Sequence, residues 1–260
     1  MTNYICAAGK GEVTSDECLL CAYQKENICG FDHAMLSKIL APEDRSPGIH
    51  VSDLVGCSLK AYNERNIDAP EYIHHRLSLF LGKSVHAYLE SHDAPTHQNE
   101  VSVSGWGVVG TADVVTTNGR IVDYKTIRKL DKFFLPHASH ALQLNIYAAM
   151  LEANGTNVEE LYVQYISTDG PSRCPACNKM VIPGGEFGYQ CPQCGRSKKS
   201  YHPGVYLVEV PKMDRDDIQA LIVERASDLE ACLALQSAPK GEPSWVCGFC
   251  RFKENCPDKE

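Results

Sequence analysis

Cysteine spacing is the feature that most limits how this chain can fold. The 260 residues include 13 cysteines, of which all but Cys232 fall into groups with the spacing of metal ligands. A disulfide framework of a secreted protein is the alternative. It is disfavoured because the count is odd, the first residues show no secretory pattern and the cysteines occur as CxxC pairs. The pattern therefore predicts metal sites.

Composition narrows the class of protein. Hydrophobic residues make up 43% and charged residues 22%, which is typical of a soluble globular chain. No apolar run is long enough for a membrane span, so we expect a cytoplasmic protein without a membrane partner. The net charge is 25 − 33 = −8, so any contact with DNA must be confined to a local basic groove.

Apolar periodicity predicts one α/β core with two cysteine-rich additions. We expect helices over 51–66, with Cys57 inside, and over 72–92, 137–154 and 214–236. Strands are expected over 100–105, 107–115, 120–126, 161–168 and 204–211, with turns at Ser104-Gly105 and Asn118-Gly119. The predicted domains are an N-terminal cysteine-rich segment, a core in two pieces and an insertion: 1–40, then 41–169 with 204–260, and 170–203.

Two neighbouring predicted strands carry two aspartates and a lysine. Asp123 and Lys125 point to one face of their strand because side chains alternate, and Asp113 lies on the strand before. Asp113 joins that face only if a three-residue loop, 117–119, connects the strands with Gly119 in the left-handed conformation. Two adjacent carboxylates repel unless a cation lies between them, and oxygen ligands suit Mg²⁺ or Mn²⁺. The alternative is a set of solvated strand charges.

These motifs resemble the RecB branch of the PD-(D/E)xK nucleases. GTADVV and VDYKT match its metal-binding strands, GKSVHAYLE its GxxxHxxxE helix and QLNIYAAM its QxxxY motif, although Ala112 replaces the proline of the family name. The resemblance implies a restriction-endonuclease-like fold, a mixed sheet flanked by helices. It makes Lys125 the catalytic lysine, Gln143 and Tyr147 a substrate-binding pair, and the following groups the ligands of Mg²⁺ or Mn²⁺: His86, Asp113, Asp123 and the backbone carbonyl of Tyr124.

Without the resemblance, His86 reads as a helix histidine satisfied by a neighbour and Tyr147 as core packing. Glu90 and Glu100 are acids near the site to which the sequence gives no role.

The C-terminal cysteines are one ligand short of a closed site. Cys57 can complete the set Cys247, Cys250 and Cys256. One cysteine before the nuclease motifs and three after them resemble the fourth CRISPR-associated protein family and bacterial break-processing helicase-nucleases, which implies a 4Fe-4S cluster. Zinc on the same four thiolates is the alternative.

The insertion has the spacing of a zinc ribbon, with two CxxC pairs: Cys174, Cys177, Cys191 and Cys194. Its basic residues Arg196, Lys198 and Lys199 either touch phosphate or a partner, or are simply solvated. The N-terminal segment offers a second zinc site of looser spacing, for which His33 could replace one cysteine: Cys6, Cys18, Cys21 and Cys29. We expect this segment to lack a core of its own, so that a metal folds it.

A run of basic residues leaves the second active strand and could line a DNA track, or could be a solvated loop: Arg120, Lys125, Arg128, Lys129 and Lys132. The combined prediction is a metal-dependent DNA exonuclease acting on single-stranded ends. The alternative is a catalytically silent, nuclease-derived DNA-binding or adaptor subunit in recombination, repair or CRISPR adaptation, docked to protein partners through its zinc modules. A redox sensor has no support beyond the cysteines.

Overall fold

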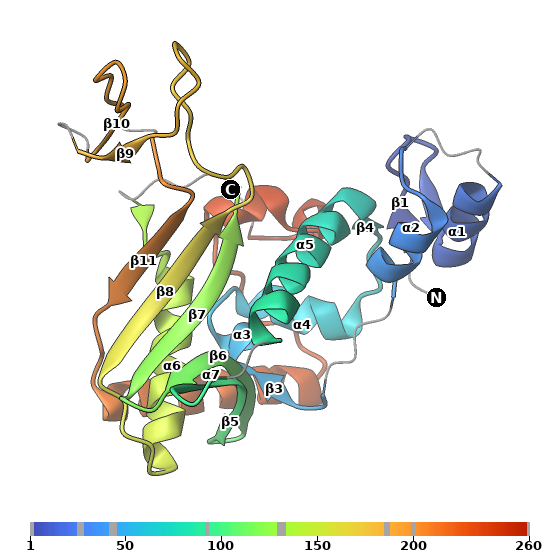
Figure 1. Ribbon diagram of the computed structural model, residues 1–260. Coiled ribbons are helices and arrows are strands. Elements are labelled where there is room, and N and C mark those ends of the chain that lie inside the picture. The colour runs from blue at the N-terminus through green and yellow to red at the C-terminus, as the bar shows by residue number, and fades with distance from the viewer. Residues whose placement is uncertain are drawn as a thin grey trace. The chain divides into compact units, whose positions relative to one another are not determined.

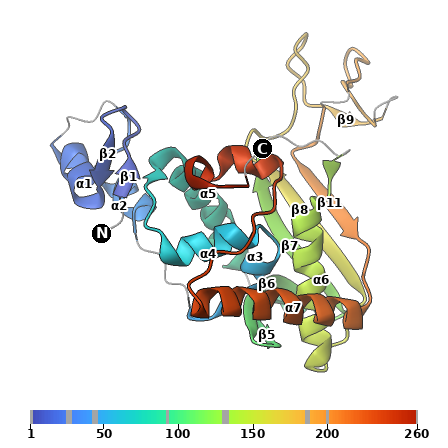
Figure 2. The ribbon, with the colours of Figure 1, turned by 180° about the vertical axis from the view of Figure 1, so that it is seen from behind.

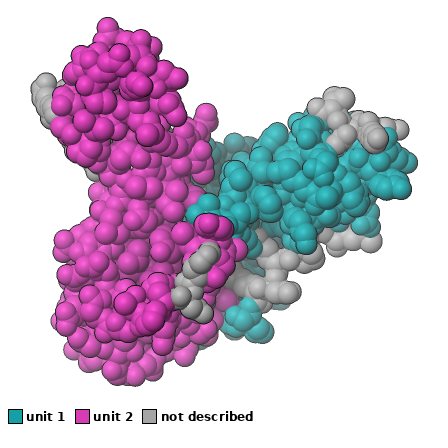
Figure 3. Space-filling view, viewed as in Figure 1, with its two compact units in different colours: residues 1–49, 56–85, 224–260 teal, residues 50–55, 86–223 magenta. Residues whose placement is uncertain are grey.

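The computed structural model describes residues 3–24, 29–41, 46–91, 94–128, 134–184, 188–198 and 201–258, apart from the side chains of Trp245 and Asn255. Two compact units are distinguished by colour in Figure 3: residues 1–49, 56–85 and 224–260, and residues 50–55 and 86–223. The predicted division into three domains stays a prediction. Within the described ranges, no helix combines the length and apolar composition that crossing a membrane requires.

The second unit contains a mixed six-stranded sheet flanked by helices (Figures 1 and 2), which confirms the predicted fold class. The strand order is β11-β8-β7-β6-β3, and β5 also pairs with β6. The pairs β11–β8, β5–β6 and β6–β7 are antiparallel. β7 and β8 are parallel and are connected through helix α6. The strands are β3 (Ile49–His50), β5 (His97–Gly105), β6 (Val108–Thr116), β7 (Arg120–Ile127), β8 (Glu160–Ser167) and β11 (Val205–Val210).

Helix α6 (Ala138–Ala153) lies across the sheet and buries an unbroken run of eight residues, 144–151. Gly155 ends it in the left-handed conformation, with a φ of 85°. Helix α3 (Val51–Leu54) also belongs to this unit, as do the last residues of α5 (Ile73–Glu90), from His86 onward, and the first residues of α7 (Arg215–Ala234).

The loop between β6 and β7 has the predicted geometry. Val114 pairs with Val122 and Val115 with Ile121, which leaves the three residues 117–119 as the loop. Gly119 has a φ of 81°, in the left-handed region. The predicted loop is therefore confirmed, whereas the turn expected at Ser104-Gly105 is wrong. Gly105 pairs with Val108, so the turn is Trp106-Gly107, where both residues have positive φ.

One predicted helix is two helices in the structure. The expected helix over 51–66 is interrupted after α3, and α4 (Ser58–Asn66) begins with Cys57 as its N-cap instead of carrying Cys57 inside. Gly56 explains the break, because glycine is a poor helix former and leaves the chain free to turn. Cys57 therefore lies at the start of α4 and not within a helix.

The first unit contains a small sheet in the order β2-β1-β4. Tyr4, Phe31, Leu36 and Ile73 belong to its buried apolar cluster. As expected, the N-terminal segment has no core of its own, because residues beyond position 32 supply the apolar side chains that complete this cluster. Its other elements are β1 (Asn3–Ile5), β2 (Glu12–Thr14), β4 (Glu71–Tyr72), α1 (Ser15–Tyr23), α2 (His33–Ile39) and the 3-10 helices η2 (Trp245–Phe249) and η3 (Lys253–Asn255).

The insertion between β8 and β11 is built from short pieces. Its strands β9 (Ile182–Pro183) and β10 (Tyr189–Gln190) pair antiparallel. Asn178 and Gly195 each follow a CxxC pair in the left-handed conformation, and their backbone N–H groups donate to the carbonyls of Cys174 and Cys191. The two CxxC turns therefore share one backbone geometry.

Candidate functional site

Three elements of the second unit converge on a charged site. β6 and β7 pair at Val114 with Val122 and at Val115 with Ile121, and the next position of this register sets Asp113 opposite Asp123. Residues directly opposite in a ladder share a face. The Nδ1 of His86, from the last turn of α5, lies 3.6 Å from the Oδ2 of Asp113. The Nζ of Lys125 lies 2.8 Å from the Oδ2 of Asp123 and 3.0 Å from its Oδ1. The structure thus brings together the four residues predicted for catalysis.

Both aspartates are buried, at 9% exposure for Asp113 and 1% for Asp123. Burial is the main cause that raises the pKa of Asp113, and it raises that of Asp123 to about 6. Lys125 and His86 oppose these rises, and the backbone N–H of Tyr124 donates to Asp113 at 2.6 Å. The protein's own positive charge therefore does not fully compensate the two carboxylates.

An added cation fits this arrangement. The Oδ2 of Asp123 is buried and accepts no hydrogen bond. The ammonium of Lys125 lies close to it, but the hydrogen bond that Lys125 donates goes to Oδ1. Carboxylate oxygens are the ligands that Mg²⁺ and Mn²⁺ prefer. The assignment of His86, the two aspartates and the carbonyl of Tyr124 as one ligand set stays a prediction.

Two further acids extend the site. One ligand atom each from His86, Glu90 and Glu100 lies within 4.8 Å of the others, a spacing that a metal ion could bridge. Glu100 has a φ of 48° within β5, which is strained for a residue with a side chain. Burial and the nearby carboxylate of Glu90 raise the pKa of Glu100 to about 7. The sequence shows Glu90 in a motif, but no local pattern marks Glu100, which only the β5–β6 pairing brings here.

The predicted substrate-binding residues have mixed surroundings. The Nε2 of Gln143 donates to the Oη of Tyr147 at 2.8 Å, and Tyr147 is buried while Gln143 is half-buried. Arg128 is 89% exposed, with its Nε 3.8 Å from Asp169. Their contacts with DNA stay predictions, and Lys129, Lys132 and Lys199 lie outside the described residues.

The four cysteines of the insertion form a compact thiol group. All four sulfurs lie within 4.8 Å of one another, with Sγ–Sγ distances of 3.5 Å between Cys174 and Cys194 and 3.3 Å between Cys177 and Cys191. A tetrahedral zinc with bonds of about 2.3 Å separates its sulfurs by about 3.8 Å. The buried hydroxyl of Tyr201 has no hydrogen-bond partner of ordinary geometry, and the charge of Cys174 acts on it. The group is therefore shaped to hold a metal ion.

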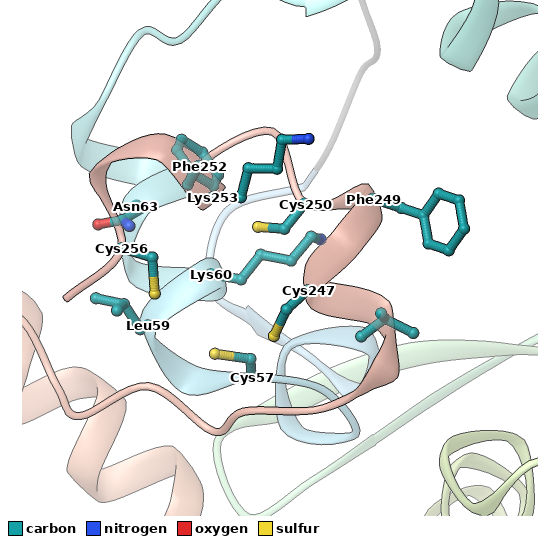
Figure 4. A pocket seen from close by; sticks show the side chains of 11 residues that line it. Cys57, Leu59, Lys60, Asn63, Cys247, Phe249, Cys250, Phe252, Lys253 and Cys256 are labelled. Carbon is teal, nitrogen blue, oxygen red and sulfur yellow. The ribbon is translucent and has the colours of Figure 1, made fainter. Parts of the chain in front are cut away.

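The C-terminal cysteines surround a cavity in the first unit (Figure 4). Cys57, Cys247, Cys250 and Cys256 line a space of about 240 Å³ with apolar and lysine side chains. Backbone N–H groups of Glu242 and Ser244 donate to Cys57 and Cys247, at 3.4 and 3.3 Å. In the described part of the chain, no three of these thiols come as close together as the thiols of the insertion.

The N-terminal cysteines also lie near one another. Burial, followed by the charges of Cys6, Cys29 and Cys21, raises the pKa of Cys18 to about 11. Helix α1 carries Cys18 and Cys21, and a Thr14 capping box fixes its start. A zinc ion at this site stays a prediction.

Comparison with known proteins identifies the family. Residues 33–257 match the sequence profile of the PD-(D/E)XK nuclease superfamily. The chain belongs to this superfamily. Its members are nucleases that use divalent metal ions, so the paired aspartates and Lys125 lie in a domain whose relatives cleave nucleic acid. None of the curated proteins matches this PD-(D/E)XK chain.

Two solved structures are similar to this superfamily member. The crystal structure of the protein SSO0001 has 22% identity and a TM-score of 0.52, over 95% of this chain and 98% of that one. The likeness shows a shared fold. A phage-related exonuclease from Haemophilus somnus 129PT has 12% identity and a TM-score of 0.42, over 74% of this chain and 96% of that one. That score is too low to support an inference.

Proposed function

We propose that this PD-(D/E)XK protein is a metal-dependent deoxyribonuclease that hydrolyses single-stranded DNA from its ends. The observation that carries the proposal is the grouping of His86, Asp113, Asp123 and Lys125, in which His86 lies 3.6 Å from Asp113 and Lys125 lies 2.8 Å from Asp123. A site that had lost catalysis would have no need to bury two repelling acids, because burying an uncompensated charge costs stability.

The residues have separate roles in the hydrolysis. His86, Asp113, Asp123 and the carbonyl of Tyr124 would hold Mg²⁺ or Mn²⁺, which supplies Lewis-acid activation of the phosphodiester. Lys125 is held by Asp123, and its ammonium stabilises the negative charge that develops on the phosphate. Water adds to phosphorus as the bond to the leaving oxygen breaks.

Support for a DNA substrate comes from the family and from local charge. The chain is acidic overall, with a net charge of −8. Lys125 nevertheless lies on β7, the strand that carries the site, and the exposed Arg128 directly follows that strand. We propose that these two residues are part of a local basic track that binds the phosphate backbone.

A cleavage assay tests the proposal. Labelled single-stranded DNA, blocked or free at its ends, is incubated with Mn²⁺ and either wild-type protein or Lys125→Ala. We expect the wild type to shorten only DNA with a free end and the variant to lose about 100-fold or more in rate. Equal cleavage by both proteins would contradict the catalytic role of Lys125. An adaptor subunit would bind the DNA and leave it intact.

We further propose that the C-terminal cysteine cavity holds a 4Fe-4S cluster instead of a single zinc. Its thiols are spaced more widely than those of the insertion and enclose a cavity, as a group larger than one ion requires. Lys60 and Lys253 line the same cavity, and their positive charges favour an anionic thiolate cluster. Anaerobic purification followed by iron and sulfide analysis tests this proposal. A third zinc in place of iron would contradict it.

The insertion and the N-terminal segment are proposed to bind zinc, at Cys174, Cys177, Cys191 and Cys194 and at Cys6, Cys18, Cys21 and Cys29. The compact thiol group of the insertion supports the zinc site there. We also propose that the protein acts in recombination, repair or CRISPR adaptation and that these two modules contact a protein partner.

A further inference from the structure

A polar pair beside Lys125 has no role in the mechanism described so far. Tyr165 on β8 lies directly opposite Lys125 in the parallel β7–β8 ladder, so both side chains share the face that also carries Asp123. Tyr165 is fully buried. Its hydroxyl lies 2.9 Å from the Nδ1 of His140, in the first turn of α6.

The hydrogen bonds determine which nitrogen of His140 carries the proton. The backbone N–H of His137 donates to the Oη of Tyr165 at 3.1 Å. Burial raises the pKa of Tyr165 to about 12, so its hydroxyl keeps its proton, and Nδ1 of His140 is the acceptor within reach. The reverse arrangement would leave the buried hydroxyl proton without an acceptor, which is costly. Because burial lowers the pKa of His140 to about 3, the ring is neutral and its remaining proton is on Nε2.

The Nε2–H group of His140 is therefore a hydrogen-bond donor with a fixed direction, and it points away from Tyr165. It has no hydrogen-bond partner within the described residues. The charge of Lys125 acts on the same imidazole, so the donor lies in the field of the ammonium group. A neutral N–H donor beside a cation suits a ligand that is both anionic and rich in acceptor oxygens, which describes a phosphate and not a base edge.

We propose that His140 is a further substrate-binding residue of the nuclease site, donating from Nε2 to a phosphate oxygen of the bound DNA strand next to Lys125. Tyr165 is a positioning residue that acts through His140, because its hydroxyl holds the ring orientation and the tautomer. This inference rests on the proposed deoxyribonuclease function and adds a contact that selects the phosphate backbone.

The test compares wild-type protein with His140→Leu, His140→Gln and Tyr165→Phe. Binding of a fluorescent single-stranded oligonucleotide is measured in Ca²⁺, and kcat and KM are measured in Mn²⁺. We expect His140→Leu to weaken binding and raise KM by about tenfold, the loss typical of one hydrogen bond to a charged group. Glutamine also carries an N–H donor, so His140→Gln restores most of the affinity. Tyr165→Phe falls between them.

Controls separate this inference from the proposed function. A single cooperative unfolding transition shows that each His140 variant folds, and His140→Leu should unfold a few degrees below the wild type because it leaves the Tyr165 hydroxyl without an acceptor. His75→Ala, at an exposed histidine of α5, leaves binding and cleavage unchanged. Wild-type protein that binds DNA without cleaving it contradicts the proposed function, while the binding series still decides the role of His140. Binding by His140→Leu within twofold of wild type, or an equal loss in His140→Gln, overturns the inference.

Discussion

Asp123 is the most deeply buried acid of the site, so Asp123→Asn tests the electrostatics directly. The substitution removes the charge and keeps the shape of the side chain. Lys125, which loses its partner, is 22% exposed and can return to water. In the absence of a divalent ion, we expect the variant to be more stable than the wild type at neutral pH, because the wild-type carboxylate is buried without full compensation. With Mn²⁺ present, the variant should lack nuclease activity, because it has lost a proposed metal ligand.

The magnitude follows from the pKa of the folded protein. Asp123 rises from its ordinary pKa of 3.8 to about 6 in the folded state, so the folded protein holds this proton to higher pH than the unfolded chain does. The cost of the carboxylate is absent below about pH 3.8 and complete above about pH 6. The difference of about 2 between the two pKa values corresponds to about 3 kcal/mol, and about half of that cost develops between pH 5 and 7.5.

The assay is urea unfolding of both proteins at pH 5 and 7.5, in buffer freed of Mg²⁺ and Mn²⁺. Comparing the two proteins at each pH cancels the acid sensitivity of the cysteine-bound metals. The stability advantage of Asp123→Asn should grow by about 1–2 kcal/mol between the two pH values, and Mn²⁺ should stabilise the wild type alone. Asp228→Asn, at an exposed acid of α7, should show no pH-dependent difference. An advantage that stays constant or shrinks as pH rises would refute the reasoning.

Four further substitutions test the packing, the acids and the cysteine sites. Gly110→Ala would place a Cβ 2.8 Å from Cε1 of Tyr147; calorimetry should show a loss of about 1–3 kcal/mol, and an unchanged melting temperature would contradict this. Glu100→Gln should weaken Mn²⁺ binding about tenfold by titration calorimetry, since a neutral amide is a poorer ligand; equal affinity would remove Glu100 from the site. Cys177→Ser should lose one zinc by elemental analysis and keep cleavage. Cys57→Ser should lose iron and keep that zinc, and retention of iron would rule out Cys57 as a ligand.

The local sequence was sufficient to predict those side-chain positions that depend on a single strand or turn. The alternation of VDYKT set Asp123 and Lys125 on one face, and the need to bring Asp113 to that face predicted the loop of residues 117–119. The spacing of the two CxxC pairs likewise predicted a compact thiol group. In each case the relevant side chains lie within about a dozen residues of one another along the chain or repeat one turn geometry.

Other features depended on contacts between distant segments. Glu100 has a left-handed backbone conformation within β5 and lies near Glu90 of α5. The hydrogen bond between Tyr165 and His140 joins β8 to α6. The sequence by itself determined five of the six strands of the main sheet, the alternation of their side chains and the grouping of the cysteines, because these follow from periodicity and short-range backbone geometry. Only the tertiary structure decided how many acids share the site, which proton His140 carries and where the helix before Cys57 breaks, because those depend on burial and hydrogen bonds that arise when the elements pack.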